Sequence, residues 1–408
     1  MRVLLSTLGS RGDVEPLVAL AVALKAQGAD AVVCAPADVE FIELTDRAGV
    51  EFAPAFMPIR AFIAMARKDP KPLPERAADV AQAQFEAISA AAEGCDAVVG
   101  TGLMPSVAAA QCVAELNGLP WFKVGLCPMY LPSEAHAPHA YPGRLHPEGV
   151  TDNRVLWNHD IETINAIFGP AVNGLRTRLG LPVTDNVRDH VFTRSPFLAS
   201  DATLWPWEPS DLCEAAQTGA WILEDDRPPS PELEAFLNAG EAPVYVGFGS
   251  LPTHDPKEAA RIAIEAVRGQ GRRIVLLRGW ADLDRIDGGE DVLVIGEVNQ
   301  QALFRRVAAV VHHGGAGTTT TAAHAGAPQV IVPQIVDQPF WARKVARLGI
   351  GAAHDGPVPT VDSLSVGLAF ALRPETKARA AAIAAEVRRD GAAVAARLIV
   401  DRIGPVSP

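Results

Sequence analysis

Short runs of apolar and β-branched residues recur along the chain, separated by stretches with helical periodicity. These runs lack the polar–apolar alternation of half-exposed strands, which is typical of strands buried on both faces of a parallel sheet. They form two series, at 2–9, 29–36, 96–102, 121–127 and 199–205 in the first half and at 243–250, 272–280, 291–298, 308–315 and 328–335 in the second. The pattern predicts an α/β protein with two doubly wound parallel-sheet domains.

A stretch rich in proline and acidic residues separates the two series. The sequence therefore predicts an N-terminal domain over residues 1–205, an interdomain linker over 206–240 and a C-terminal domain over 241–385. Residues 386–408 are expected to form a helix that packs back on the N-terminal domain. Ligands of such sheets bind beyond the carboxyl ends of the strands, so two facing domains imply a cleft between them.

Charge and cysteine content exclude several classes of partner. The chain has 36 basic and 48 acidic residues and a net charge of −12, whereas nucleic acids and anionic membranes need clustered basic residues. The 5 cysteines include no CxxC pair, and the N-terminal apolar run ends without a cleavage site. No run approaches the roughly 20 apolar residues of a membrane span. We therefore expect a cytoplasmic protein, a monomer or weak homo-oligomer, that binds neither nucleic acid nor membrane.

The sequence HHGGAGTTTT follows one of the apolar runs of the second half. The glycines of Gly314–Gly317 let the backbone approach a ligand closely, and the following helix presents unpaired N–H groups and the positive end of its dipole, which suits phosphate. Thr318 and Thr319 can cap this helix and donate to phosphate oxygens, and His313 can donate to a diphosphate. His312 points to the opposite side of the strand. A capped turn with a satisfied histidine explains the same residues, so the motif alone leaves both interpretations open.

A second polar pair, Asp337-Gln338, stands just beyond the carboxyl end of a buried run. A carboxylate beside a carboxamide can bind several hydroxyls of a sugar through hydrogen bonds. Asp337 can instead be the N-cap of a helix, because Pro339 follows two residues later. Two irregular stretches, 56–80 and 128–153, are either the pocket of a bulky partner molecule or mobile surface loops.

The series H-G-G-A-G-T, P-Q and D-Q resembles the donor-nucleotide signature of bacterial glycosyltransferases of the two-Rossmann-domain, or GT-B, type. With GSRGDVEPLVALA near the N-terminus and PVYVGFGS at 243–250, the resemblance extends over nearly the whole chain. It is to the enzymes that decorate glycopeptide antibiotic aglycones in actinomycetes. The resemblance implies an inverting, metal-independent transfer from UDP-glucose or a TDP-deoxysugar, without a cofactor. The acceptor it implies is a natural-product aglycone, glycopeptide-like or a macrocycle such as an ansamycin, modified in biosynthesis or for inactivation.

The resemblance also assigns roles to individual residues. Asp13 corresponds to the family's candidate general base, although it can equally cap the helix predicted at 14–28, and an ordinary aspartate pKa of about 3.9 is low for a base. It assigns the parts of the donor to three groups of residues. These are Ser10, Ser250, His313, Gly315, Ala316, Gly317 and Thr318 for the diphosphate, Trp280 and Val298 for the nucleotide base, and Asp337 and Gln338 for the sugar. Trp280 can equally belong to the core.

Other functions make different demands on the same motifs. A two-domain sugar-nucleotide epimerase needs further acids or bases, and a non-catalytic sugar-nucleotide binding protein has no need of Asp13. An NAD-dependent oxidoreductase needs G-x-G-x-x-G after the first strand, where this chain has GSRGD. A D-x-D string at Asp282–Asp284 stands in a polar stretch that favours a solvated loop over a metal site. The sequence therefore predicts a glycosyltransferase, with the epimerase and the binding protein as alternatives.

Overall fold

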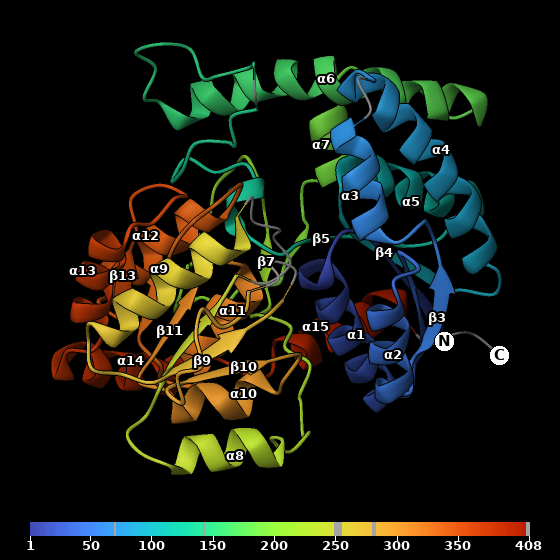
Figure 1. Ribbon diagram of the computed structural model, residues 1–408. Coiled ribbons are helices and arrows are strands. Elements are labelled where there is room, and N and C mark those ends of the chain that lie inside the picture. The colour runs from blue at the N-terminus through green and yellow to red at the C-terminus, as the bar shows by residue number, and fades with distance from the viewer. Residues whose placement is uncertain (69–70, 142, 249–254, 280–282, 405–408) are drawn as a thin grey trace. The chain divides into compact units, whose positions relative to one another are not determined.

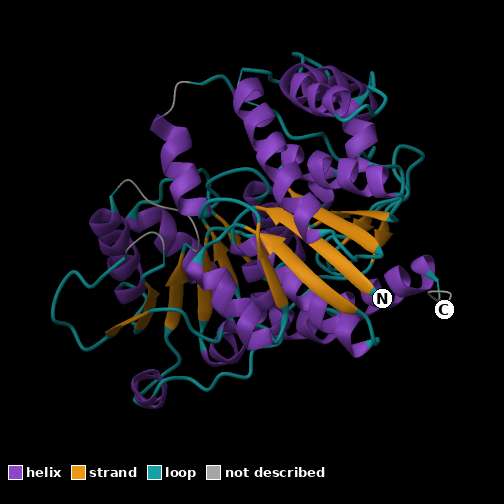
Figure 2. Ribbon diagram, turned by 90° about the vertical axis from the view of Figure 1, so that its right-hand side faces the viewer, coloured by secondary structure: helices purple, strands orange, loops and turns teal. Residues whose placement is uncertain are grey.

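The structure is a computed structural model that describes residues 1–68, 71–141, 143–248, 255–279 and 283–404 (Figure 1). The chain divides into two compact units. Unit 1 comprises Met1–Ser200, Trp207–Leu223 and Arg389–Pro408, and unit 2 comprises Asp201–Pro206 and Glu224–Arg388. Each unit contains one parallel sheet with helices packed around it (Figure 2). The prediction of two doubly wound α/β domains is confirmed.

The sheet of unit 1 has the strand order β3-β2-β1-β4-β5-β6-β7. Its strands are β1 (Arg2–Leu8), β2 (Asp30–Ala35), β3 (Glu51–Pro54), β4 (Ala97–Gly102), β5 (Trp121–Gly125), β6 (Phe197–Leu198) and β7 (Ala216–Gln217). Its helices are α1 (Arg11–Ala26), α2 (Val39–Ala48), α3 (Ile59–Lys68), α4 (Leu73–Ala91), α5 (Met104–Asn117), α6 (Asn153–Arg178), α7 (Val187–Phe192) and α15 (Gly391–Ile403). Val3, Leu4 and Leu5 are all fully buried. Because successive side chains of a strand point to opposite faces, both faces of β1 are covered, as its uninterrupted apolar run predicts.

The sheet of unit 2 has the strand order β10-β9-β8-β11-β12-β13. Its strands are β8 (Val244–Gly247), β9 (Ile274–Leu277), β10 (Val292–Ile295), β11 (Ala309–His312), β12 (Gln329–Ile331) and β13 (Gly351–Ala353). Its helices are α8 (Pro231–Asn238), α9 (Pro256–Arg268), α10 (Gln300–Leu303), α11 (Ala316–His324), α12 (Gln338–Leu348), α13 (Val361–Ala371) and α14 (Pro374–Glu386). Val244 and Val246 belong to one hydrophobic cluster and Tyr245, between them, to another. This sheet is therefore also buried on both faces.

The strand order fixes where a ligand can bind in each unit. In unit 1 the chain runs outward from β1 to β2 and β3, then returns to β4 on the other side of β1. In unit 2 it runs outward from β8 to β9 and β10, then returns to β11 on the other side of β8. Doubly wound sheets bind ligands beyond the carboxyl ends of the strands at such reversals. The turns that follow β1 and β11 therefore lie at the expected binding edges.

One predicted strand is absent and the predicted linker contains secondary structure. The run at 199–205 is not a strand, because the carboxylate of Asp201 accepts from the amides of Thr203 (2.8 Å) and Leu204 (3.4 Å) and closes a turn there. The segment 206–240 carries β7, which pairs with β6, and α8. At the end of the chain, α15 packs on α1 within unit 1. No helix among the described residues has the length and apolarity to cross a membrane.

The start of α15 makes a contact that only glycine permits, which yields a stability prediction. A Cβ on Gly391 would lie 2.4 Å from the carbonyl oxygen of Ala220 and 2.5 Å from the backbone of Gly219. We expect Gly391→Ala to destabilise unit 1 by about 1–3 kcal/mol, because the overlap is with backbone atoms. As a control, Gly174→Ala in α6 meets only Arg178 at 3.7 Å and should stabilise by about 0.5–1 kcal/mol. Calorimetric melting of both variants checks this; unchanged melting of Gly391→Ala would contradict the packing.

Candidate functional site

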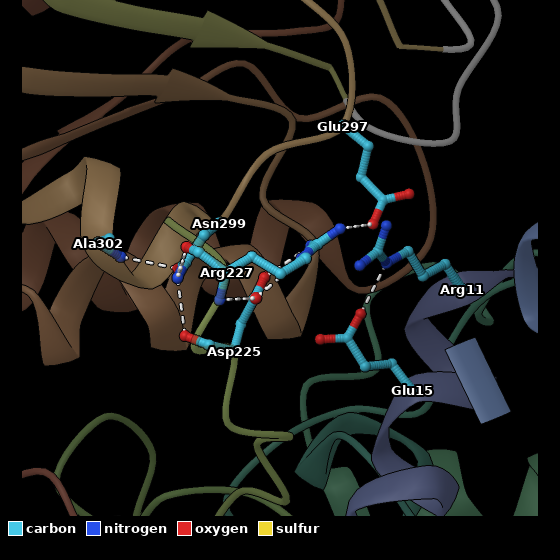
Figure 3. Close-up of polar contacts among 7 residues, drawn as sticks. All are labelled: Arg11, Glu15, Asp225, Arg227, Glu297, Asn299 and Ala302. Atoms are coloured by element: carbon cyan, nitrogen blue, oxygen red, sulfur yellow. Dashed lines mark hydrogen bonds and ion pairs between the residues drawn. The ribbon is translucent and has the colours of Figure 1, made fainter. Parts of the chain in front are cut away.

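In unit 1, the turn after β1 holds a carboxylate against the backbone. Asp13 lies in the first turn of α1, and its Oδ2 accepts from the amide of Ser10 at 2.9 Å. A Cβ on Gly9 would lie 2.1 Å from this oxygen, so glycine is required there for the carboxylate to fit. Asp13 is thus the third residue of the helix and not its N-cap; the N-cap is Ser10. In the same helix, Arg11 at position 1 donates to Glu15, one turn later, at 2.6 Å (Figure 3).

A buried lysine is electrostatically coupled to Asp13. Lys123 stands on β5, its side chain is buried, and its ammonium donates to the carbonyl of Val124 at 2.6 Å. Burial lowers the pKa of Lys123 to about 8, and the Asp13 carboxylate acts in the opposite direction. The protonated lysine in turn favours the ionised form of Asp13. Lys123 is not among the site residues predicted from the sequence, although a lysine inside the apolar run at 121–127 is a signal for it.

In unit 2, His312 closes the turn between β11 and α11. Its Nδ1 accepts from the amide of Gly314 at 3.1 Å, so the ring proton is on Nε2, which donates to Oε1 of Gln329 at 2.9 Å. The amide group of Gln329 donates to the carbonyl of Thr319 at 3.3 Å. Burial lowers the pKa of His312 to about 3, so the ring is neutral. Both ring nitrogens are therefore committed to protein partners.

His313 has a different environment. Its ring is half-buried and stands at 88° to that of His312. Its Nδ1 is buried and has no hydrogen-bond partner among the described residues. A Cβ on Gly315 would lie 2.6 Å from its Nε2, so the ring rests on the glycine. Burial lowers the pKa of His313 to about 4. His313 is therefore a neutral imidazole with hydrogen-bonding capacity for a ligand.

The N-terminus of α11 lies directly beyond His313. Gly315 is the N-cap, without a side-chain cap, and the first helical hydrogen bond runs from the Thr319 amide to the Gly315 carbonyl at 2.9 Å. The amides of Ala316, Gly317 and Thr318 precede it and have no partner within the helix. The expectation that Thr318 and Thr319 cap the helix is wrong. The Thr319 hydroxyl donates to the Gly315 carbonyl at 2.9 Å and the side chain is fully buried, so only the Thr318 hydroxyl is placed to meet a ligand.

Asp337 and Gln338 lie at the start of α12, after β12. Asp337 is the N-cap by position but makes no side-chain cap; its Oδ2 accepts from the indole of Trp341 at 3.0 Å. Burial raises the pKa of Asp337 to about 6. The side chain of Gln338 is buried, and its Oε1 accepts from the amides of Gln334 and Ile335. The helix-start interpretation and the ligand interpretation therefore both remain compatible with Asp337.

The loop after β10 is held by charged and amide side chains (Figure 3). Arg227 pairs with Glu297 at 2.9 Å, and the Asn299 side chain donates to the carbonyls of Asp225 (2.7 Å) and Arg227 (3.0 Å). Between them, Val298 is half-buried and packs against the hydrophobic cluster of unit 2. These contacts hold the loop that carries Val298, the residue predicted to bind the nucleotide base.

Some predicted positions lie outside the described residues, namely Ser250, Trp280 and the first aspartate of the D-x-D string, Asp282. The second, Asp284, pairs with Arg278 at 3.5 Å. Across the described ranges, no three histidine, cysteine or acidic side chains are grouped so that they could hold a metal ion.

The two predicted motifs of unit 2 are in contact. Gly314 has φ 92°, and a Cβ there would lie 2.6 Å from the side chain of Ile331 and 3.2 Å from the carbonyl oxygen of Gln338. The turn at 313–318 and the Asp337-Gln338 pair are therefore neighbours within unit 2. Ser10 and Asp13 are neighbours within unit 1. The supporting role of Gln329 is not predicted from the sequence, because a glutamine at the start of an apolar run gives no signal for such a role.

The sequence matches two domain families and several curated proteins. Residues 3–135 match the glycosyltransferase family 28 N-terminal domain, and residues 281–398 match the erythromycin biosynthesis protein CIII-like C-terminal domain. Three proteins of Amycolatopsis orientalis cover the whole chain and 99% of their own length. They are glycosyltransferase GtfE, 51% identical, vancomycin aglycone glucosyltransferase, 49% identical, and dTDP-epi-vancosaminyltransferase, 47% identical.

Solved structures agree on the fold. The glycotransferase of kitacinnamycin superposes with a TM-score of 0.72 at 21% identity and covers 99% of both chains. The calicheamicin glycosyltransferase CalG4 superposes with a TM-score of 0.66 at 17% identity, over 100% of this chain and 99% of its own. The GT-B architecture predicted from the sequence is thereby confirmed. Identity near 50% along the full length shows more than a fold: the chain belongs to the family of GT-B glycosyltransferases that includes the actinomycete glycopeptide glycosyltransferases.

Proposed function

We propose that this glycosyltransferase moves a sugar from a nucleoside diphosphate donor to a hydroxyl of an antibiotic aglycone, with inversion and without a metal ion. The observation that carries the proposal is the site in unit 2. There a neutral histidine, whose buried Nδ1 has no partner among the described residues, stands beside the open N-terminus of α11. Together these groups suit a diphosphate.

The donor site supplies hydrogen bonds in place of a cation. The amides of Ala316, Gly317 and Thr318 point along the helix axis and carry the positive end of its dipole. His313 adds one N–H donor to the same region. As the bond between the sugar and the diphosphate breaks, negative charge grows on the leaving oxygens, and fixed donors stabilise that charge without reorganising. Asp337 and the amide group of Gln338 then bind the sugar hydroxyls.

The acceptor hydroxyl is activated from unit 1. Its oxygen attacks the anomeric carbon from the side opposite the diphosphate, the carbon–oxygen bond to the diphosphate breaks, and that electron pair leaves with the diphosphate. Asp13 takes the proton of the hydroxyl. One oxygen of Asp13 accepts from Ser10, which fixes the direction of the carboxylate, and the buried ammonium of Lys123 favours its ionised form.

Donor and acceptor are proposed from the relatives. Their names specify a glucosyl group, a dTDP-activated sugar and the vancomycin aglycone, so we propose UDP-glucose or a TDP-deoxysugar as donor and a glycopeptide-type aglycone as acceptor. A macrocycle such as an ansamycin, modified for inactivation, is the second candidate. The stretches 56–80 and 128–153 belong to unit 1 and are proposed to select the acceptor. The expectation that 56–80 is irregular is wrong, because α3 and the start of α4 make most of its described part helical. The epimerase alternative is not favoured, because the relatives are named transferases. The 5 buried free cysteines suit a cytoplasmic enzyme.

Calorimetric titration and product analysis test this function. UDP, TDP and NAD are titrated separately, with EDTA present in a parallel series. Each donor that binds is then paired with glycopeptide, macrolide and ansamycin acceptors, and products are identified by mass spectrometry. We expect binding of UDP or TDP in the presence of EDTA and a mass gain of one sugar. Binding of NAD alone would contradict the proposal.

Asp13 is expected to be needed for turnover and not for donor binding. In Asp13→Asn the amide oxygen still accepts from the Ser10 N–H, so the turn is preserved while the proton acceptor is lost. We expect kcat to fall by about 10²–10⁴ with donor affinity unchanged. Asp13→Ala is the matched variant that loses the Ser10 hydrogen bond as well. Steady-state kinetics distinguish the two losses, and near-normal kcat in Asp13→Asn would exclude Asp13 as the base.

His313 is expected to contribute directly to diphosphate affinity. His313→Ala removes the imidazole donor, so affinity for UDP or TDP should fall about tenfold or more, the loss of one hydrogen bond to a charged group. The matched control is His324→Ala at the other end of α11, where the ring contacts the carbonyl of Arg388 at 2.7 Å. Titration calorimetry measures both. Equal affinities of His313→Ala and wild type would place the diphosphate elsewhere.

Asp337 predicts how donor binding depends on pH. Because burial raises its pKa to about 6, Asp337 takes up a proton in the folded protein as pH falls through 6, where an exposed aspartate stays ionised. The ionised carboxylate is the better acceptor for sugar hydroxyls, so donor affinity should weaken from pH 7.5 to pH 5. Asp337→Asn should bind more weakly at pH 7.5 and lose this pH dependence. The same slope in both proteins would show that another group titrates.

A further inference from the structure

The turn that carries Asp337 contains a strained residue. Val336 has φ 57°, in the left-handed region where a β-branched side chain is a rare outlier. Such a conformation costs on its own and persists only where surrounding contacts determine it. Val336 directly precedes Asp337, so whatever holds Val336 also directs the Asp337 carboxylate.

Gln338 supplies the contacts that hold this turn. Its side-chain Oε1 accepts from the backbone amides of Gln334 at 2.8 Å and Ile335 at 3.1 Å. Its backbone amide donates to the carbonyl of Ile335 at 3.2 Å. Its side chain is only 6% exposed. Both partners of Oε1 are N–H donors, so the carboxamide must present its oxygen to the turn and its NH₂ group away from it. Three hydrogen bonds therefore close the backbone around Val336.

The same residue touches the diphosphate turn. A Cβ on Gly314 would lie 3.2 Å from the carbonyl oxygen and 3.4 Å from the Cβ of Gln338. On its other side, Asp337 accepts from the indole of Trp341. Gln338 thus lies between the turn at 313–318 and the strained turn at 334–337. A shift of its side chain would move the sugar-binding carboxylate relative to the phosphate-binding amides.

We propose that Gln338 is a positioning residue for the donor sugar. It acts mainly by holding the Val336 turn so that Asp337 faces the sugar, and only its NH₂ group is left for a hydroxyl. This inference rests on the proposed donor site. A residue acting only through direct contact would leave its carboxamide oxygen free of the backbone, whereas this oxygen accepts from two backbone amides.

Two substitutions distinguish direct contact with the sugar from the clamp, meaning the hydrogen bonds by which Gln338 holds the Val336 turn. Gln338→Glu keeps an oxygen acceptor for the two amides and removes the NH₂ donor, whereas Gln338→Met keeps the size and removes both. Hydrogen–deuterium exchange of the unliganded protein reports the clamp directly. We expect the amides of Gln334 and Ile335 to exchange at least about tenfold faster in Gln338→Met and to stay slow in Gln338→Glu. Equal exchange in both variants would overturn the clamp.

Sugar affinity then connects the clamp to function. UDP-glucose and TDP-glucose are titrated beside UDP and TDP. In Gln338→Met we expect sugar-nucleotide affinity to fall about tenfold and nucleotide affinity to change less than about twofold, with a smaller loss in Gln338→Glu. Adding Val336→Gly to Gln338→Met should restore part of the affinity, because glycine adopts positive φ without strain, while amide exchange stays fast.

The outcomes distinguish this inference from the proposed function. If Gln338→Met and Gln338→Glu lose sugar affinity equally and Val336→Gly restores none, Gln338 acts by direct contact and the inference is wrong. If the wild type binds no sugar nucleotide, the proposed function fails, and amide exchange still decides whether Gln338 holds the turn. The control is Gln300→Met. In the wild type, the Gln300 carboxamide donates to the Tyr245 hydroxyl at 3.1 Å. This variant should leave both sugar affinity and exchange of the Val336 turn unchanged.

Discussion

The hydrogen bond from the Gly314 amide to Nδ1 of His312 determines how the turn between β11 and α11 is built. It fixes the tautomer of His312, so Nε2 donates to Gln329, and Gln329 in turn binds the backbone of α11. It also turns the chain at Gly314 with φ 92°, a conformation that glycine adopts without the cost of a side chain. As a result His313 leaves the sheet, rests on Gly315 and stands beside the open amides of α11.

Unit 1 applies the same construction to a different chemical group. A strand at the reversal of sheet order ends in glycine, and a helix begins at once. There the glycine, Gly9, makes room for the carboxylate of Asp13, whereas in unit 2 Gly315 makes room for an imidazole. In the proposed mechanism, the base Asp13 stands in unit 1 and the neutral hydrogen-bond donors for the diphosphate stand in unit 2. This division matches the proposed chemistry, in which Asp13 removes a proton and negative charge accumulates on the diphosphate.

Much of this arrangement is predictable from sequence because it depends on local patterns. Uninterrupted apolar runs identify buried parallel strands, and the glycines after β1 and β11 mark the turns. The exceptions arise where tertiary or side-chain contacts decide. Asp201 turns the chain where an apolar run predicts a strand. The Thr319 hydroxyl binds its own helix and not a ligand. The positive φ of Val336 has no sequence signal, because valine favours extended backbone, and the contacts that impose it come from the following helix.

Burial shapes the electrostatics of the donor site in opposite directions for its two titratable groups. It lowers the pKa of His313 to about 4 and raises that of Asp337 to about 6, because a charge of either sign is costly away from water. His313 is therefore neutral near pH 7, whereas Asp337 is still largely ionised there and takes up its proton only as pH falls through 6. With a net charge of −12, the chain offers little long-range attraction for an anionic donor. The proposed donor site fits this, because the α11 N-terminus and a neutral His313 offer oriented dipoles at short range.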